Sequence, residues 1–190
     1  MTDQNSYNLD PHWLPFVSRL PSQTPEFIRS WLLDESSLTK RLIFCSGHEF
    51  RVEVLYQGWN TPYLSEQLRL GTSHREYVLL REVILYCNEK PTVYARTTIP
   101  RSSLRGQLKG LSQLGTKPLG AAIFKDPTLH RELVDIGRFD ASQLPAPITD
   151  FIKPNQQYGW GRRSLFTVQG KPLLVSEVFL PTVLDLPYNY

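Results

Sequence analysis

Apolar and polar side chains alternate along much of this chain, and the alternation predicts β-strands. Residues 75–99 form a strong hairpin pattern, in which an almost continuous apolar strand meets an Asn-Glu-Lys-Pro turn and a returning strand. Residues 160–180 repeat the pattern around a Gly-Lys turn. Two further alternating segments, 50–57 and 128–138, add strands. The pattern therefore predicts an antiparallel sheet of about six strands.

Three other segments carry the apolar spacing that is typical of helices. Residues 24–26, Thr-Pro-Glu, combine a hydroxyl cap, a proline and an acidic residue, and an apolar stripe follows over 27–32. Similar stripes occupy 38–43 and 104–111. Strands and helices do not alternate as in a parallel sheet, and apolar helix stripes need a surface to pack on. We therefore expect an α+β fold in which helices cover one face of a single antiparallel sheet.

Composition narrows the class of protein. The chain has 190 residues, of which 41% are hydrophobic and 21% charged, so a single globular domain over 1–190 is expected. Residues 1–20 are predicted to be a flexible arm, and 139–158, with three prolines, an inserted surface connection. No apolar run approaches the roughly 20 residues that span a bilayer, and the start of the chain does not resemble a secretory signal.

Charge and motif content exclude several kinds of site. The formal net charge of +3 is too diffuse to indicate nucleic-acid binding, but it suits a small anionic ligand. The four histidines and two cysteines show no metal-ligand spacing, and Cys45 and Cys87 are expected to be free thiols. Glycine motifs for nucleotide cofactors are absent. No metal and no cofactor are therefore expected.

Two charged residues occupy positions that the pattern predicts to be buried. Both faces of the strand over 75–87 are apolar, so Arg81 projects into an apolar layer and needs an anionic partner. Glu177 is the only polar residue on one face of the last strand, so its carboxyl group needs a donor or a raised pKa. Arg81 and Glu177 are the candidate functional residues of the chain.

The residues alone leave two readings open. In the first, Arg81 pairs with an acidic residue on a neighbouring strand, such as Glu177, as a structural ion pair. In the second, both line one pocket, where the guanidinium binds a ligand carboxylate and the glutamate binds a hydroxyl group at the far end of the ligand. Arg96, on the returning strand of the first hairpin, is by pattern more typical of a solvated residue.

Several short motifs occur in an order that resembles the chorismate pyruvate-lyase family. They include Leu-Thr-Lys-Arg at 38–41, Leu-Arg-Glu at 80–82, Ala-Arg-Thr at 95–97, Leu-Gly-Thr-Lys-Pro-Leu-Gly at 114–120, Ile-Gly-Arg at 136–138, Trp-Gly-Arg-Arg-Ser at 160–164, and the segment 170–181. The resemblance extends from about residue 20 to 181. Ala95 stands where a glycine can occur in the family, and 139–158 is longer than expected.

The resemblance implies a monomeric, cofactor-free cytoplasmic lyase that converts chorismate into 4-hydroxybenzoate and pyruvate for ubiquinone biosynthesis. It implies a six-stranded antiparallel sheet and a ligand held internally beneath helical flaps. By position, the resemblance assigns Arg81 to the ring carboxylate, with help from the backbone of Leu119. The resemblance also assigns Glu177 to the ring hydroxyl and Leu38 to a contact with the ligand. Because chorismate has a second, enolpyruvyl carboxylate, we expect Arg96 to bind it. Slow release of the product and product inhibition are expected, with no nucleic-acid partner and no membrane insertion.

A non-catalytic sensor is the alternative. The same fold is similar to the effector-binding domain of a group of bacterial transcription regulators, which would bind an aromatic acid without converting it. Those regulators carry a DNA-binding domain upstream, whereas about twenty residues precede the first predicted helix here and no basic recognition helix is apparent. The enzyme is therefore the favoured prediction.

Overall fold

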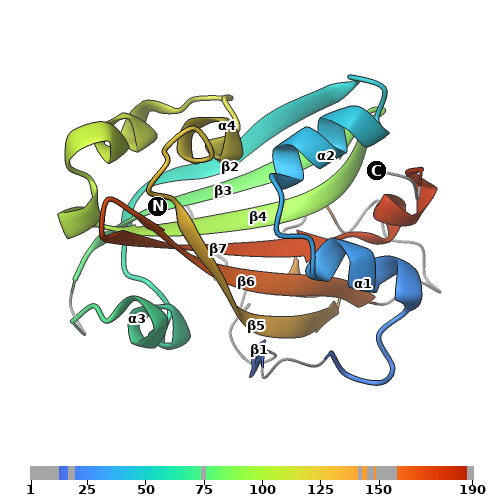
Figure 1. Ribbon diagram of the computed structural model, residues 1–190, viewed down its shortest axis with the longest axis horizontal. Coiled ribbons are helices and arrows are strands. Elements are labelled where there is room, and N and C mark those ends of the chain that lie inside the picture. The colour runs from blue at the N-terminus through green and yellow to red at the C-terminus, as the bar shows by residue number, and fades with distance from the viewer. Residues whose placement is uncertain are drawn as a thin grey trace, which may run out of the picture.

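A single antiparallel sheet of seven strands organises the computed structural model (Figure 1). The structure describes residues 13–16, 20–73, 76–140, 143–144, 148 and 158–187. The strand order is β1-β5-β6-β7-β4-β3-β2. The strands are β1 (Trp13–Pro15), β2 (Phe50–Asn60), β3 (Val78–Cys87), β4 (Lys90–Pro100), β5 (His130–Asp140), β6 (Tyr158–Val168) and β7 (Lys171–Phe179). The predicted α+β class is confirmed: six strands are long, and β1 adds a short seventh.

The expected arm over 1–20 is not free at its described residues. β1 pairs with β5 through Trp13 and Gly137. The Trp13 ring lies 5.0 Å from the ring of Phe139, edge to face, and 4.7 Å from the guanidinium of Arg163. These contacts tie residues 13–15 to the edge of the sheet, while 1–12 and 17–19 lie outside the described residues.

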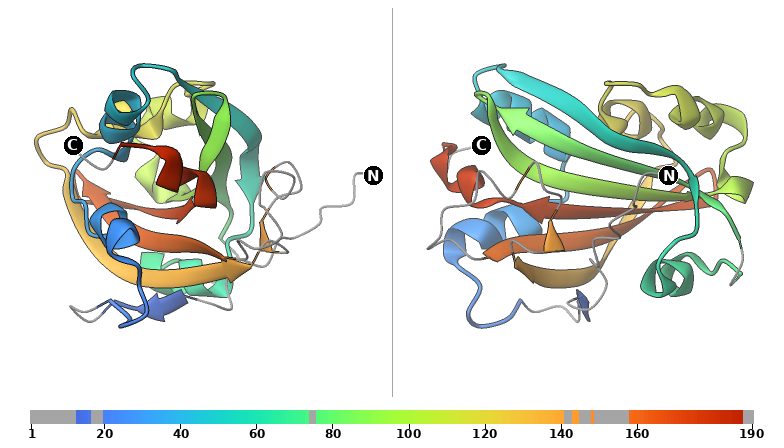
Figure 2. Two further views of the ribbon diagram at one scale, coloured as in Figure 1. Left: turned by 90° about the vertical axis from the view of Figure 1, so that its right-hand side faces the viewer. Right: turned by 180° about the vertical axis from the view of Figure 1, so that it is seen from behind.

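Helices lie on both faces of the sheet, not on one as predicted. The sheet is strongly curved, and α1 (Glu26–Leu32), α2 (Leu38–Cys45) and α4 (Leu119–Ile123) lie on its concave side (Figures 1 and 2). The third predicted helix is a 3₁₀ helix over Gly106–Gln113, which packs on the same side. The sequence pattern missed α3 (Leu64–Leu70), which lies on the convex side.

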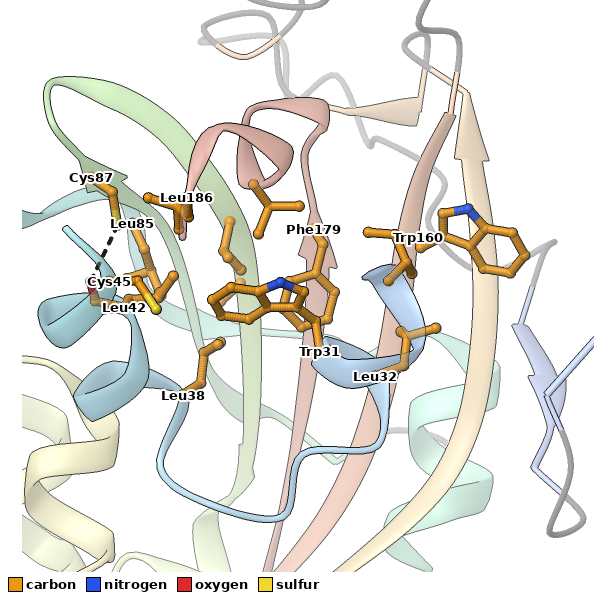
Figure 3. Close-up of a cluster of buried hydrophobic side chains, with 14 of the residues drawn as sticks. Trp31, Leu32, Leu38, Leu42, Cys45, Leu85, Cys87, Trp160, Phe179 and Leu186 are labelled. Atoms are coloured by element: carbon orange, nitrogen blue, oxygen red, sulfur yellow. Dashed lines mark hydrogen bonds between the residues drawn. The ribbon is translucent and has the colours of Figure 1, made fainter. Parts of the chain in front are cut away.

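Buried side chains fill both sides of the sheet. On the concave side, Trp31 of α1 and Leu42 of α2 pack against Leu85 and Phe179 of the strands (Figure 3). Trp31 and Phe179 have their ring centroids 5.9 Å apart. This cluster anchors the two N-terminal helices over the sheet.

The predicted surface connection over 139–158 is partly buried. Leu144 and Ile148 are 1% and 0% exposed. They belong to a cluster of buried side chains on the convex side of the sheet that includes Tyr94 and Val178. Residues 141–142, 145–147 and 149–157 lie outside the described part of the chain. At its described residues, this segment supplies core to the sheet.

Cys45 and Cys87 are both buried free thiols. In the part of the chain that the structure describes, no helix has the length and apolar character needed to cross a membrane.

Candidate active site

The register of three neighbouring strands places Arg81 and Glu177 on one face of the sheet. Arg81 of β3 lies opposite Thr97 of β4, and Glu177 of β7 lies opposite Ala95 of β4. Strands are spaced about 4.8 Å apart and each residue advances about 3.3 Å. The two residues are therefore displaced by roughly 10 Å across the sheet and roughly 7 Å along it. Both side chains project toward the concave side.

A pocket lies between this face of the sheet and the helices above it. Its atom-free space, counted together with the open mouth, is about 550 Å³. Arg81 and Glu177 line it together with Leu38, Thr39, Val52, Val83, Leu85, Ala95, Thr97, Pro118, Leu119, Gly120, Ile123, Phe124, Phe166 and Val175. Most of these groups are apolar, so the two charged residues are the outstanding polar features of its wall.

Arg81 is buried without a carboxylate partner among the described residues. Its Nη1 donates to Gln57 Oε1 at 2.6 Å, and its Nη2 donates to the carbonyl of Lys117 at 3.2 Å. Burial lowers the pKa of the guanidinium below its usual value. The other four buried arginines each have a carboxylate at hydrogen-bond distance, in the pairs Arg41–Asp34, Arg96–Glu66, Arg162–Glu177 and Arg163–Asp135. Arg81 can therefore accept a ligand carboxylate as its counter-ion.

Glu177 is held by a cation other than Arg81. Arg162 of β6 donates from Nε to Glu177 Oε2 at 2.6 Å, and its Nη1 donates to the carbonyls of Trp31 and Asp34. The first of the two readings, in which Arg81 pairs with an acidic residue such as Glu177, is therefore wrong among the described residues. Glu177 Oε1 accepts no hydrogen bond from the described residues, which leaves one carboxylate oxygen for a ligand donor.

Leu38 and Leu119 lie in the part of the pocket wall that is formed by the helices α2 and α4. Leu38 begins α2 and Leu119 begins α4, and both line the cavity. The two helices approach closely at Gly120, where an added Cβ would lie 2.9 Å from Thr39 Oγ1. A glycine at this position therefore allows α4 to close against α2.

Arg96 lies on the other face of the sheet, and its assignment to the second carboxylate of a ligand is corrected. Its Nε donates to Glu66 Oε1 at 2.8 Å, its Nη1 donates to Glu82 Oε1 at 2.7 Å, and its guanidinium lies 4.2 Å from the ring of Tyr63. Although burial opposes the charge, the Glu66 carboxylate raises the pKa of Arg96 above its usual value. Arg96 is 6% exposed, so the prediction from its pattern that it is solvated is also wrong, and it is a buried cation on the convex side of the sheet.

The sequence pattern missed Gln57, which orients Arg81. Alternation over 50–57 groups Gln57 with Arg51 and Glu53 on the wetter face. The strand has an irregularity between Val54 and Tyr56, and after it Gln57 lies opposite Arg81. A bulge of this kind reverses which side chains face the core, and no local signal marks it here.

Comparison with known proteins shows the family of the chain. Residues 13–186 match the family described as "Chorismate lyase". The chain is 40% identical over 171 residues to a probable chorismate pyruvate-lyase of Psychromonas ingrahamii, covering 85% of this chain and 86% of the relative. It is also 40% identical over 182 residues to one from Aromatoleum aromaticum, covering 93% and 97%.

Solved structures show the same fold at low sequence identity. PhnF from Mycobacterium smegmatis has a TM-score of 0.57 at 13% identity, covering 78% of this chain and 65% of that one. The C-terminal domain of the histidine utilization repressor from Pseudomonas syringae has a TM-score of 0.55 at 10% identity, covering 70% and 92%. The sequence match covers nearly the whole described chain, and this protein therefore belongs to the chorismate lyase family of enzymes.

Proposed function

We propose that this protein is a chorismate pyruvate-lyase, which eliminates pyruvate from chorismate and leaves 4-hydroxybenzoate. The observation that carries the proposal is Arg81, a buried cation in the wall of an apolar pocket without a carboxylate partner among the described residues. Glu177 stands across the same pocket with one carboxylate oxygen unused by the described residues. This spacing of a cation and a hydrogen-bond acceptor suits a ring with a carboxylate at one end and a hydroxyl group at the other.

The chemistry asks little of the protein beyond positioning. The hydrogen at C4 of the chorismate ring moves to the methylene carbon of the enolpyruvyl group, and the ether C–O bond at C3 breaks. The ring becomes aromatic, and the side chain leaves as pyruvate with a new methyl group. Aromatisation supplies the driving force, so holding the side chain over the ring and stabilising charge at the ether oxygen are the tasks of the pocket.

Each lining group has a role in this proposal. Arg81 binds the ring carboxylate through its guanidinium, assisted by the backbone of Leu119 at the start of α4. Glu177 Oε1 accepts a hydrogen bond from the ring hydroxyl. Leu38 at the start of α2 packs on the ring and helps to exclude water. Release then requires α2 and α4 to separate, which predicts slow departure of the product.

Incubation of the purified protein with chorismate tests the proposal directly. We expect equal amounts of 4-hydroxybenzoate, measured by its absorbance after chromatography, and pyruvate, measured with a coupled dehydrogenase. Arg81→Gln should lose most activity, whereas Arg105→Gln, at an exposed position, should retain it. Deuterium at C4 of chorismate should appear in the methyl group of pyruvate. Its appearance in solvent would favour a stepwise route through Glu177.

A protein that binds 4-hydroxybenzoate but leaves chorismate unchanged would instead be a sensor. The shared fold with transcription regulators is the observation that keeps this candidate in the test. Equimolar product formation by the wild-type protein excludes it.

We also propose that the enzyme acts as a monomer in the cytoplasm and that its product feeds ubiquinone synthesis, because the family resemblance implies it. Expression in a bacterial strain that cannot make 4-hydroxybenzoate should restore its quinone, and the Arg81→Gln variant should not. Light scattering of the purified protein should give a mass near 21.9 kDa.

A further inference from the structure

Arg131 places a second cation beside the Glu177 end of the pocket. It lies on β5 directly opposite Phe166 of β6, and Phe166 lines the pocket. Its guanidinium is 5.4 Å from the centroid of the Phe166 ring, and its Nη2 is 3.9 Å from Glu177 Oε2. Arg131 therefore belongs to the concave face, close to the wall of the cavity.

The charge of Arg131 is not balanced by its own hydrogen bonds. Its Nε donates to the hydroxyl of Ser164 at 3.1 Å, and its Nη1 donates to the backbone carbonyl of Asp34 at 2.7 Å. Both acceptors are neutral. Nη2 donates no hydrogen bond to the described residues.

The two carboxylates nearest to Arg131 that are shielded from water, those of Glu177 and Asp34, already pair with other arginines. Glu177 Oε2 accepts from Arg162 at 2.6 Å, much closer than the 3.9 Å to Arg131. The Asp34 carboxylate pairs with Arg41 at 3.0 Å, and Glu35 is exposed. Burial, and then repulsion from Arg162, lower the pKa of Arg131 to about 10. An added anion would relieve both effects.

The charges around the pocket match a ligand with two carboxylates. Arg81 contributes one unpaired positive charge at one end. At the other end, Arg131 and Arg162 face a single Glu177, which leaves one further positive charge. In chorismate the enolpyruvyl ether is on the ring carbon next to the hydroxyl-bearing carbon, and the ring carboxylate is across the ring. A pocket that binds the hydroxyl at Glu177 therefore brings the second carboxylate to this same end.

We propose that Arg131 binds the enolpyruvyl carboxylate of chorismate. The proposal rests on the proposed function and replaces Arg96, which faces the convex side. Arg162 is less suited to the role because it already binds Glu177 and the backbone carbonyls of Trp31, in the last turn of α1, and of Asp34. Arg131 is thus the residue that distinguishes the dianionic substrate from the monoanionic product.

The test compares the binding of chorismate with the binding of two ligands that do not react, the product and a dicarboxylate analogue. 4-Hydroxybenzoate has only the ring carboxylate, whereas 3-(carboxymethoxy)-4-hydroxybenzoate carries a second carboxylate beside the hydroxyl group and cannot react. In Arg131→Gln we expect the Kd of the dicarboxylate and the KM of chorismate to rise by about tenfold or more. The Kd of 4-hydroxybenzoate should stay within about twofold, since that ligand makes no contact with Arg131.

Two further variants make the result specific. Arg131→Lys keeps the positive charge and should recover part of the affinity for the dicarboxylate. Arg81→Gln should weaken both ligands alike, because both carry the ring carboxylate.

Equal loss of both ligands in Arg131→Gln would overturn the proposal, since it would show that Arg131 acts only through Glu177 or through folding. Unchanged affinity for the dicarboxylate would overturn it as well. A wild-type protein that neither binds nor converts chorismate would refute the proposed function itself. The wild-type protein is therefore assayed before any variant.

Discussion

Gln57 Oε1 accepts a 2.6 Å hydrogen bond from Arg81 Nη1, and Gln57 Nε2 donates to the carbonyl of Ser112 at 2.7 Å. The amide thus orients the guanidinium without neutralising it, and it ties β2 to the 3₁₀ helix above the pocket. A neutral partner leaves the charge of Arg81 to be satisfied by a ligand.

We therefore expect Gln57→Glu to weaken binding of 4-hydroxybenzoate by about tenfold or more, because the new carboxylate would occupy the guanidinium. The folded protein should not lose stability, since the buried cation gains a counter-ion. Isothermal titration calorimetry measures the affinity, and urea unfolding measures the stability. Undiminished affinity in this variant would show that Arg81 does not bind the carboxylate of the ligand.

Closure of α4 against α2 depends on the missing side chain at Gly120. In Gly120→Ala the added Cβ would lie 2.9 Å from Thr39 Oγ1 and 3.3 Å from Ser37 Oγ, so the Thr39 side chain must rotate or α4 must move away from α2. We expect faster release of product and a several-fold higher inhibition constant for 4-hydroxybenzoate, measured from progress curves with added product.

Gly110→Ala is the matched control, because a Cβ there would meet nothing within 4 Å. It should leave product inhibition unchanged. If wild-type progress curves already stay linear with excess 4-hydroxybenzoate, slow release does not occur and the closure argument fails.

Arg96→Gln should affect stability and leave ligand affinity intact. Removing the cation leaves Glu66, which is 2% exposed, and the half-buried Glu82 without their charged partner. Breaking a buried ion pair from one side costs about 3–5 kcal/mol. Urea unfolding should show this loss, while the folded variant binds 4-hydroxybenzoate as the wild-type protein does. A loss of affinity for 4-hydroxybenzoate without a loss of stability would show that Arg96 acts in ligand binding after all.

Buried thiol and phenol groups predict how stability depends on pH. Burial raises the pKa of Cys45, Cys87 and Tyr94. The folded state therefore keeps these protons at a pH where the unfolded chain releases them, and the free energy of unfolding should fall as pH rises above about 9. Urea unfolding at pH 8 and pH 10 measures the change. Slow reaction of both thiols with a disulfide reagent in the native protein, and rapid reaction in denaturant, would support the same cause.

Much of this protein follows from local sequence. The hairpins, the α+β class and the burial of Arg81 and Glu177 rest on periods of apolar residues, which are set by backbone geometry over a few positions. The same reasoning shows that Arg162 and Arg163 face opposite ways, and they bind Glu177 and Asp135 on opposite faces.

For Arg96, the face of the sheet was decided by an irregularity in the strand pairing that alternation cannot reveal. Cys87 lies opposite Lys90, and continuing that register without interruption would put Arg96 opposite Arg81. A shift between Leu85 and Tyr86 puts Thr97 there instead and turns Arg96 to the convex side. A slip of one residue moves a whole segment to the other face, because side chains alternate with a period of two.

The partners of the two candidate residues also depended on the tertiary structure. The bulge in β2 turns Gln57 toward Arg81. The pairing of β6 with β7 places Arg162 directly opposite Glu177. A similar shift between Leu133 and Asp135 keeps Arg131 on the pocket side while Asp135 faces away. These choices are made by contacts between strands distant in sequence. Alternation along the chain was therefore enough to predict that Arg81 and Glu177 are buried, whereas the burial of Arg96 and the pairing of the charged groups depend on contacts that only the folded sheet makes.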